Sequence, residues 1–186
     1  MTDTRPRHAA PWVIDTRALG LAKRRGPGQS HPLELHAPAP ERTATAVVEI
    51  PTGGDVHLSG LLESVAEGVL VTATATAEAT ASCARCLREM TLTVRAPLRE
   101  MYAYPDSTTA ETTDEDEVPR LVDDLIDLEP LVHDELVLVM PSAPVCSPDC
   151  PGLCPQCGER LDAVGPDHRH DTLDPRWAAF ADLLEP

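Results

Sequence analysis

The stretch VLVTATATAEATAS (residues 69–82) decides the fold class of this chain of 186 residues. Apolar and polar residues alternate in it for over a dozen positions, with four threonines and two valines among them. A period of two residues is that of a strand with one face toward a core and one toward water, and β-branched residues suit strands. The stretch therefore predicts one long β-strand with a polar face.

The segments on either side repeat this period. Residues 43–50 and 56–65 are predicted strands separated by the turn sequence PTGGD, and residues 91–104 alternate again. Pro97 limits the middle of the last strand to a sheet edge or a bulge, because proline cannot donate a ladder hydrogen bond. Alternating runs joined by short turns are typical of antiparallel sheets. We therefore predict an α+β fold built on an antiparallel meander or partly closed barrel.

Fewer elements are expected after the meander. Residues 105–119 show no apolar period and are predicted to form a disordered acidic loop. Residues 124–128 suit a short strand. Apolar spacing over residues 129–140, with Pro130 in the first turn, favours a helix, with a buried strand as the alternative. The first helix of the fold is thus expected after the acidic loop.

The two ends of the chain differ in pattern. Residues 1–42 are rich in proline and charge and are expected to be partly ordered, with Trp12 docked through a short strand or a turn of helix. The stretch DPRWAAFADLL (residues 174–184) opens with an N-cap aspartate followed by proline, which predicts a short C-terminal helix. The expected organisation is an N-terminal segment 1–42, a β domain 43–144, and a cysteine-rich zinc-binding segment with the C-terminal helix, 145–186.

The charge of the chain restricts its partners. The formal net charge is −16 and the isoelectric point is about 4.6. Such a surface repels phosphate backbones and anionic lipids, which disfavours broad binding to nucleic acid or membranes and favours a basic protein partner. Acidity that only keeps the protein soluble is the simpler alternative. The basic triplet Lys23, Arg24 and Arg25 is either a solvated linker or a phosphate contact.

The six cysteines are interpreted through the expected compartment. No N-terminal apolar run resembles a signal peptide, and no window reaches the roughly 18 apolar residues of a membrane span. The chain is therefore predicted to be cytoplasmic, where thiols stay reduced and cysteine pairs are more often metal ligands than disulfides. The predicted zinc ligands are Cys83, Cys86, Cys146, Cys150, Cys154 and Cys157.

Two of the cysteine pairs have the C-x2-C spacing of zinc knuckles. A tight turn between two such thiolates aims both at one metal ion. In CPQCG (residues 154–158), Gly158 permits a positive φ just after the turn. CARC (residues 83–86) has the spacing without the glycine, and Cys146 and Cys150 are spaced C-x3-C. The loop around the last four cysteines has few apolar residues, so metal is its expected organiser.

Six thiols exceed one tetrahedral site, and the histidines of HRH would complete a second. Three arrangements are open. The first has Cys83, Cys86, Cys146 and Cys150 at one zinc and Cys154, Cys157, His168 and His170 at another. The second gathers the four cysteines from Cys146 to Cys157 around one ion, and the third joins the two C-x2-C pairs. A solvated loop is the simpler interpretation of the two histidines. One or two structural zinc ions are therefore expected.

Catalytic interpretations of the cysteines fit the pattern less well. Thiol–disulfide exchange at CARC requires the first cysteine at a helix N-terminus, where the helix dipole lowers the thiol pKa. Here, strands are expected on both sides of the motif. Protein ligands are expected to fill the coordination positions of each zinc ion, whereas a catalytic zinc keeps one position for water. No phosphate-binding loop or catalytic triad pattern stands out. The chain is therefore predicted not to be an enzyme.

Taken together, CARCL after the β region, the acidic spacer, LVMPSAPVCSPDCPGLCPQCG and DPRWAAFADLL resemble the bacterial YceD family, and the Ala/Arg-rich composition with one lysine suggests a high-GC bacterium. Members of this family are called large ribosomal RNA subunit accumulation proteins. The resemblance covers roughly residues 43–186. It implies a non-enzymatic role in 23S ribosomal RNA accumulation and large-subunit assembly, with the subunit precursor as partner. Some members lack GLCPQCG, which favours grouping the CARC thiols with Cys146 and Cys150.

The charge and the resemblance lead to one hypothesis. Residues 111–135 hold eleven acidic residues against one arginine, a plausible decoy for a basic ribosomal protein. Any contact with 23S RNA would then be local to arginines near the metal sites, namely Arg85, Arg88, Arg160 and Arg169. The alternatives are a zinc-ribbon regulator that binds nucleic acid directly and a C-x2-C thiol oxidoreductase.

Overall fold

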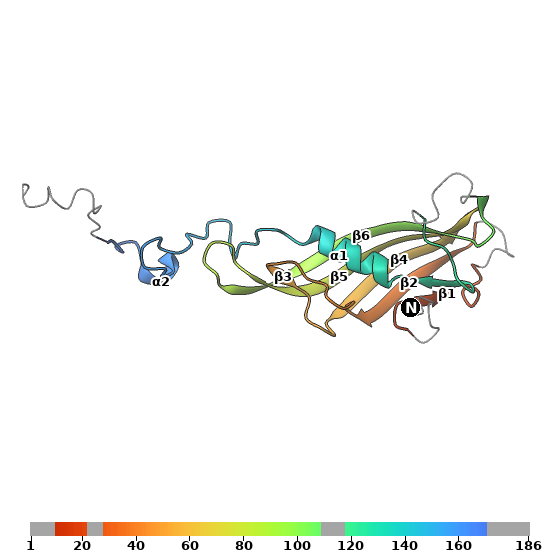
Figure 1. The fold of residues 1–186 in the computed structure, drawn as a ribbon, viewed down its shortest axis with the longest axis horizontal. Helices are drawn as coiled ribbons and strands as arrows, with labels where there is room; N and C mark the ends of the chain where they lie inside the picture. Colours follow the sequence, from red (N-terminus) through yellow and green to blue (C-terminus); the bar gives the residue numbers. More distant parts are fainter. Residues whose placement is uncertain (1–9, 22–27, 109–117, 171–186) are drawn as a thin grey trace, which may run out of the picture. The chain divides into compact units, whose positions relative to one another are not determined.

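The computed structural model describes residues 10–21, 28–108 and 118–170 (Figure 1). The chain divides into two compact units. One consists of the residues up to Ser82 together with Glu89–Pro144, and the other of Cys83–Arg88 together with the residues from Val145 onward. The CARC motif therefore belongs to the same unit as the later cysteines, although about sixty residues separate them in sequence.

The first unit is built on an antiparallel sheet of five strands, with one of its two longest strands at the centre. It contains β2 (Ser30–Pro38), β3 (Val48–Glu49), β4 (Asp55–Ser64), β5 (Gly68–Ser82) and β6 (Glu89–Ala103). β5 pairs along its whole length with β6 on one side, and with β4 and then β3 on the other. β2 pairs with β4. The α+β prediction with an antiparallel meander is confirmed, and the sheet is open, with β2 and β6 unpaired with each other among the described residues.

The alternation in β5 separates a core face from a solvent face, as predicted. Its odd-numbered residues from Val69 to Ala81 are buried, whereas most of the threonines between them are exposed. Alanine on the core face permits close packing of the covering layer. Gly60 of β4 lies against its neighbour β5, because a Cβ there would clash with the Thr72 carbonyl oxygen and with Ala73.

The edge strands explain where the proline residues lie. Pro97 is in β6, and β5 is the one strand of the described residues that pairs with β6, so the prediction of an edge position is confirmed. β2 was not predicted, because Pro32 and Pro38 interrupt an otherwise alternating segment. Both prolines are exposed on an edge strand, whereas Leu33 and Ala37 point to the core, and edge strands tolerate proline.

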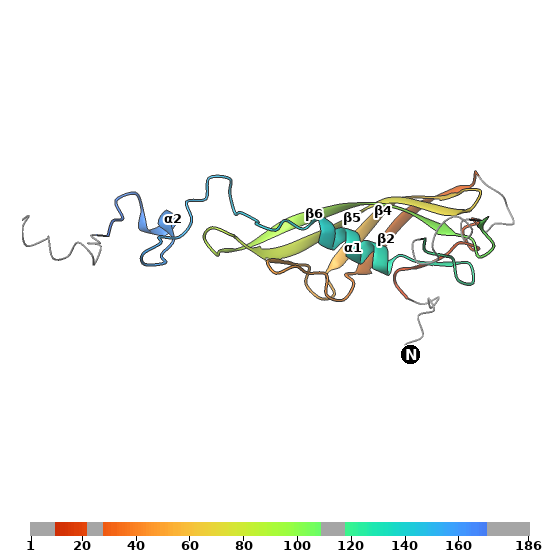
Figure 2. The ribbon, with the colours of Figure 1, turned by 45° about the horizontal axis from the view of Figure 1, so that its top comes forward.

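A second small sheet and one helix complete the first unit. β1 (Val13–Asp15) pairs with β7 (Leu125–Asp127), and α1 (Glu129–Val139) follows directly. The predicted helix after the acidic loop is therefore confirmed. α1 buries Val132 and Leu136 in the same core as the β5 alanines, and Figures 1 and 2 show it lying along one face of the sheet.

The N-terminal part of the unit is anchored through Trp12. This side chain is 1% exposed and donates its indole N–H to the Pro38 carbonyl oxygen at 3.0 Å. Among the described residues, no helix is long and apolar enough to cross a membrane. Three sequence predictions lie outside the described residues: the basic triplet 23–25, the middle of the acidic loop (109–117) and the C-terminal helix (174–184).

Candidate metal centres

The second unit gathers its eight candidate ligands into two groups of four. Within each group, the ligand atoms all lie within 4.8 Å of one another. Of the three arrangements left open by the sequence, these are the groups of the first. The four-thiol group contains Cys83, Cys86, Cys146 and Cys150. The mixed group contains Cys154, Cys157, His168 and His170.

Both C-x2-C motifs form the same turn. In the first, the Cys83 N–H donates to the Arg88 carbonyl oxygen at 2.8 Å, and the Leu87 N–H donates to the Cys83 carbonyl oxygen at 2.9 Å. In the second, the corresponding bonds run from Cys154 to Glu159 at 2.7 Å and from Gly158 to Cys154 at 2.9 Å. The two motifs are therefore equivalent knuckles.

The missing glycine of the first knuckle is replaced by a leucine in the same backbone conformation. Leu87 has φ 57°, and Gly158 at the equivalent position has φ 75°. The left-handed region costs an L-residue roughly 1–2 kcal/mol relative to glycine. The weaker sequence signal of CARC thus reflects a strained residue and not a different turn.

Backbone N–H groups point at the first sulfur of each knuckle. The Cys146 N–H donates to Cys83 Sγ at 3.4 Å, and this bond is the main reason why the Cys83 pKa falls to about 6. The Cys154 pKa also falls to about 6, through bonds from the backbone of Cys157 and Gln156. Hydrogen bonds to a thiolate favour the ionised form, which is the form that binds metal.

The remaining thiols of the four-thiol group show why a cation fits there. Hydrogen bonding with Cys150 and Cys86 raises the Cys146 pKa to about 12, and burial raises that of Cys150. Thiolates packed this closely repel one another, so without a cation some keep their protons. A divalent cation at the centre removes that conflict, because it compensates the negative charge of its ligands.

Arg85 fixes the second segment of the four-thiol group. Its guanidinium donates to the carbonyl oxygens of Pro148 and Cys150, both at 3.1 Å. Gly152, with φ 83°, passes so close that a Cβ would lie 3.2 Å from the Arg85 carbonyl oxygen. The sequence interpretation missed both roles. The Pro-Gly dipeptide before Leu153 was a turn signal, but nothing in the pattern marked Arg85 for a role within the unit.

The mixed group is more open to solvent. Cys154 is buried, but Cys157 is exposed. Cys157 Sγ lies 3.4 Å from His168 Nε2, which lies 2.8 Å from His170 Nε2. Two imidazole nitrogens this close must share a proton or a cation. The short helix α2 (Leu161–Val164) connects this knuckle to the histidines.

Most of the arginines proposed for RNA contact form hydrogen bonds or ion pairs within the second unit. Besides Arg85, Arg88 pairs with Asp162, and Arg160 Nε lies 3.3 Å from a carboxylate oxygen of the same aspartate. Asp162 raises the pKa of Arg88 further. Among the described residues, Arg169 alone of the four has no such partner. The unit therefore presents little free basic surface.

The fold and the site define a protein with an open antiparallel sheet and a cysteine-rich loop unit whose two ligand sets suit tetrahedral metal ions. A family described as large ribosomal RNA subunit accumulation protein YceD matches residues 71–184, which include all eight candidate ligands. This chain belongs to the YceD family.

The relatives extend the comparison beyond that family match. An uncharacterized protein of Mycobacterium tuberculosis is 47% identical over 184 residues, which cover 98% of this chain and 86% of the relative. One from Mycobacterium leprae is 41% identical over 98% of this chain and 82% of its own length. The uncharacterized Bacillus subtilis protein YlbN is 26% identical over 131 residues, 70% of this chain and 74% of that protein. No solved structure matches this chain.

Proposed function

We propose that this protein is a non-catalytic factor that supports accumulation of 23S ribosomal RNA and assembly of the large ribosomal subunit, with two structural zinc ions in its second unit. The observation that carries the ribosomal role is the family match over residues 71–184. That match begins within β5 and takes in both ligand groups, so it spans parts of both units. In this proposal, the partner is a basic protein of the large-subunit precursor.

The chemistry of the two ligand groups supports zinc. Zinc takes four cysteine or histidine ligands in a tetrahedron, and sets of four cysteines, or of two cysteines with two histidines, are typical of its structural sites. Soft thiolates also select it over magnesium or calcium. The second unit has only the four-residue helix α2 as regular structure among its described residues. Structural zinc contributes about 10–16 kcal/mol of apparent binding free energy in small domains, which can replace a hydrophobic core there.

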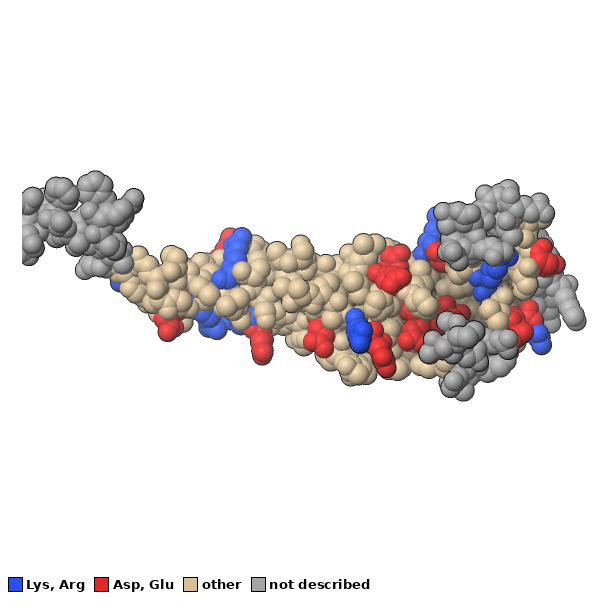
Figure 3. Space-filling view, viewed as in Figure 1, with Lys and Arg blue, Asp and Glu red and all other residues tan. Residues whose placement is uncertain are grey.

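The charge distribution supports a basic protein as the partner. The described residues of the first unit carry seventeen aspartates and glutamates against five arginines, a formal net charge of −12. In the described part of the second unit, four acidic residues balance four arginines. Figure 3 shows acidic side chains spread over the first unit on the face in view. A field of this sign attracts a cationic protein and repels an RNA backbone.

The test combines zinc stoichiometry with capture of ribosomal components. Native mass spectrometry of the purified full chain is expected to give two zinc ions, and a chelator is expected to remove them. In a pull-down at moderate salt, the immobilised protein is expected to retain a basic large-subunit protein. Retention of bare 23S RNA without any basic protein would overturn the proposed partner. A chain free of zinc with a reactive CARC motif would favour thiol oxidoreductase chemistry instead.

A further inference from the structure

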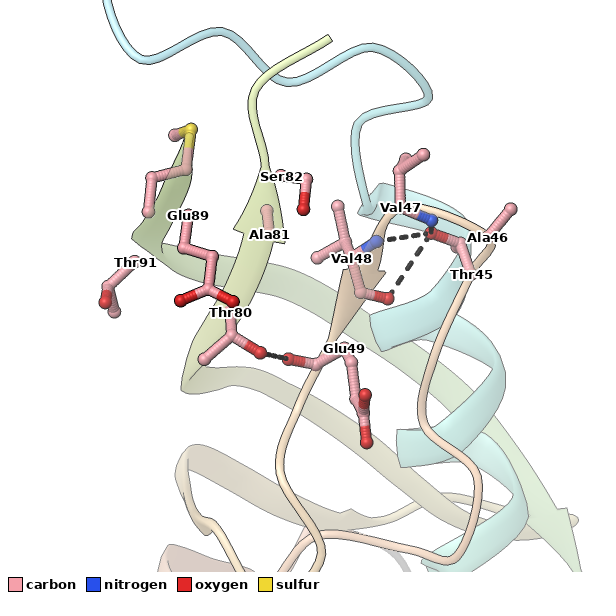
Figure 4. Close-up of a pocket in the computed structure, with 11 residues that line it drawn as sticks. Thr45, Ala46, Val47, Val48, Glu49, Thr80, Ala81, Ser82, Glu89 and Thr91 are labelled. Atoms are coloured by element: carbon pink, nitrogen blue, oxygen red, sulfur yellow. Dashed lines mark hydrogen bonds between the residues drawn. The ribbon is translucent and has the colours of Figure 1, made fainter. Parts of the chain in front are cut away.

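The first unit contains a groove of about 560 Å³ at the end of the sheet where β5 and β6 approach their connecting loop (Figure 4). Its floor is residues 80–82 of β5. Residues 89–91 of β6 form one wall, and residues 45–49, which include β3, form the other. The groove thus lies entirely within the first unit.

The groove is preformed. The Thr45 hydroxyl accepts hydrogen bonds from the N–H groups of Val47 at 3.4 Å and Val48 at 3.1 Å, and the Thr80 hydroxyl donates to the Glu49 carbonyl oxygen at 3.3 Å. Figure 4 shows these bonds within the wall and between wall and floor. A binding partner therefore meets a wall that is already ordered, which lowers the entropic cost of association.

The backbone of the floor is already used by the sheet. Ala81 is paired with Val48 on one side and Met90 on the other, and Thr80 is paired with Glu49 and Thr91. An incoming chain cannot add to this strand by backbone hydrogen bonds, as in strand addition. Recognition in this groove must therefore come from side chains.

The side chains that line the groove suit a cation with an aliphatic stem. Glu49 and Glu89 are exposed on opposite walls, and neither carboxylate has a hydrogen-bond or ion-pair partner among the described residues. Val47 offers partly buried apolar surface in the wall that carries Glu49. The methyl groups of the exposed residues Thr80 and Thr91 add to it, since the register places both in one cross-strand row with Glu49. Lysine and arginine place their methylene stems along apolar surface while their charged heads meet carboxylates.

We propose that this groove docks an extended lysine- and arginine-rich segment of a partner protein, with cationic heads at Glu49 and Glu89 and stems against Val47 and the methyl groups of Thr80 and Thr91. The proposal rests on the proposed function, since it assigns the surface that receives the basic partner. Charge complementarity with the net −12 of the first unit selects this occupant. An anionic or purely apolar ligand would leave both carboxylates unpaired.

The experiment measures binding of a fluorescein-labelled peptide of alternating arginine and glycine to the full zinc-loaded chain by anisotropy at moderate salt. Removing one charge by Glu49→Gln or Glu89→Gln is expected to weaken binding about two- to fivefold, the range for exposed ion pairs. The double charge reversal E49K/E89K is expected to weaken it by about tenfold or more, because it adds repulsion. Glu63→Gln, on β4 outside this groove, is the matched control and is expected to bind as the wild type does.

The outcomes separate this inference from the proposed function. Equal losses from Glu63→Gln and Glu49→Gln would mean diffuse attraction by the whole unit and would overturn the groove. Binding of spermine but not of the peptide would also overturn it, in favour of a small polycation. If the double charge reversal still captures a basic ribosomal protein as the wild type does, the assignment of this groove as the docking site is wrong and the proposed function stands. Should the wild type bind the peptide but capture no such protein, the proposed function fails alone.

Discussion

The two ligand groups are built on the same turn but in different surroundings. The knuckle at residues 83–88 and the one at residues 154–159 share their hydrogen bonds and their positive φ. The first meets ligands about sixty residues further along the chain, and three of its four cysteines are buried. The second meets histidines eleven to sixteen residues away, with Cys157 exposed. One local structure thus serves a long-range connection in one case and a local loop in the other.

Because of this difference, the two groups are expected to restrain different lengths of chain. Loss of the four-thiol group would free residues 145–150 from the loop between β5 and β6, because Cys146 and Cys150 are on one segment and Cys83 and Cys86 on the other. Among the described residues, loss of the mixed group would free only residues 165–170, which follow α2. The comparison therefore predicts unequal effects for equivalent substitutions.

The largest effect is expected from Cys150→Ser. A hydroxyl is a poor zinc ligand, and three remaining thiols cannot complete a tetrahedral structural site. Native mass spectrometry is expected to show one zinc ion in place of two, and limited proteolysis is expected to cut residues 145–150 rapidly. Ser147→Ala, three residues away, is the control and is expected to keep both ions. Two ions in the Cys150 variant would rule out the four-thiol group as a zinc site.

A smaller effect is expected from His168→Ala. Its Nε2 is the atom that links Cys157 and His170 in the mixed group, so its removal is expected to release one zinc ion. Because the four-thiol group shares no ligand with it, proteolysis at residues 145–150 is expected to stay slow. Arg169→Ala, between the two histidines, is the matched control. Loss of both ions from the histidine variant would show that the groups are coupled.

The comparison also separates what the sequence could predict from what it could not. The alternation at residues 69–82 and the helical spacing at 129–140 predicted β5 and α1, because the spacing of buried residues along one strand or helix is visible in the local sequence. β2 escaped because its prolines look like breakers until the strand is known to be an edge. The spacing of the cysteines identified the candidate ligands, but it did not favour one grouping of them over another. The grouping depends on how the folded chain brings Cys83 close to Cys150.

A still smaller effect is expected from Arg85→Ala. Arg85 touches no metal position, but it holds the carbonyl oxygens of Pro148 and Cys150 in place. Residues that orient ligands typically change metal affinity by about 10–100-fold. Competition with a zinc chelator is expected to show that loss at the four-thiol group and not at the mixed group. Arg85→Lys is expected to recover part of it, whereas equal affinity in Arg85→Ala would remove the positioning role.

The smallest effect concerns the one position at which the knuckles differ in strain. Leu87 is 66% exposed and left-handed, so Leu87→Gly relieves backbone strain but makes the unfolded chain more flexible. These two effects oppose each other at about 1 kcal/mol each. The free energy of unfolding of the zinc-loaded chain, measured with denaturant, is therefore expected to change by less than about 1 kcal/mol. Gly158→Ala adds strain of about 1–2 kcal/mol, which exceeds the gain of about 0.4–1 kcal/mol from a less flexible unfolded chain, and is expected to destabilise by about 1 kcal/mol. Equal losses from both would mean that the Leu87 side chain contributes contacts that a glycine cannot replace, and the knuckles would then differ in more than their backbone.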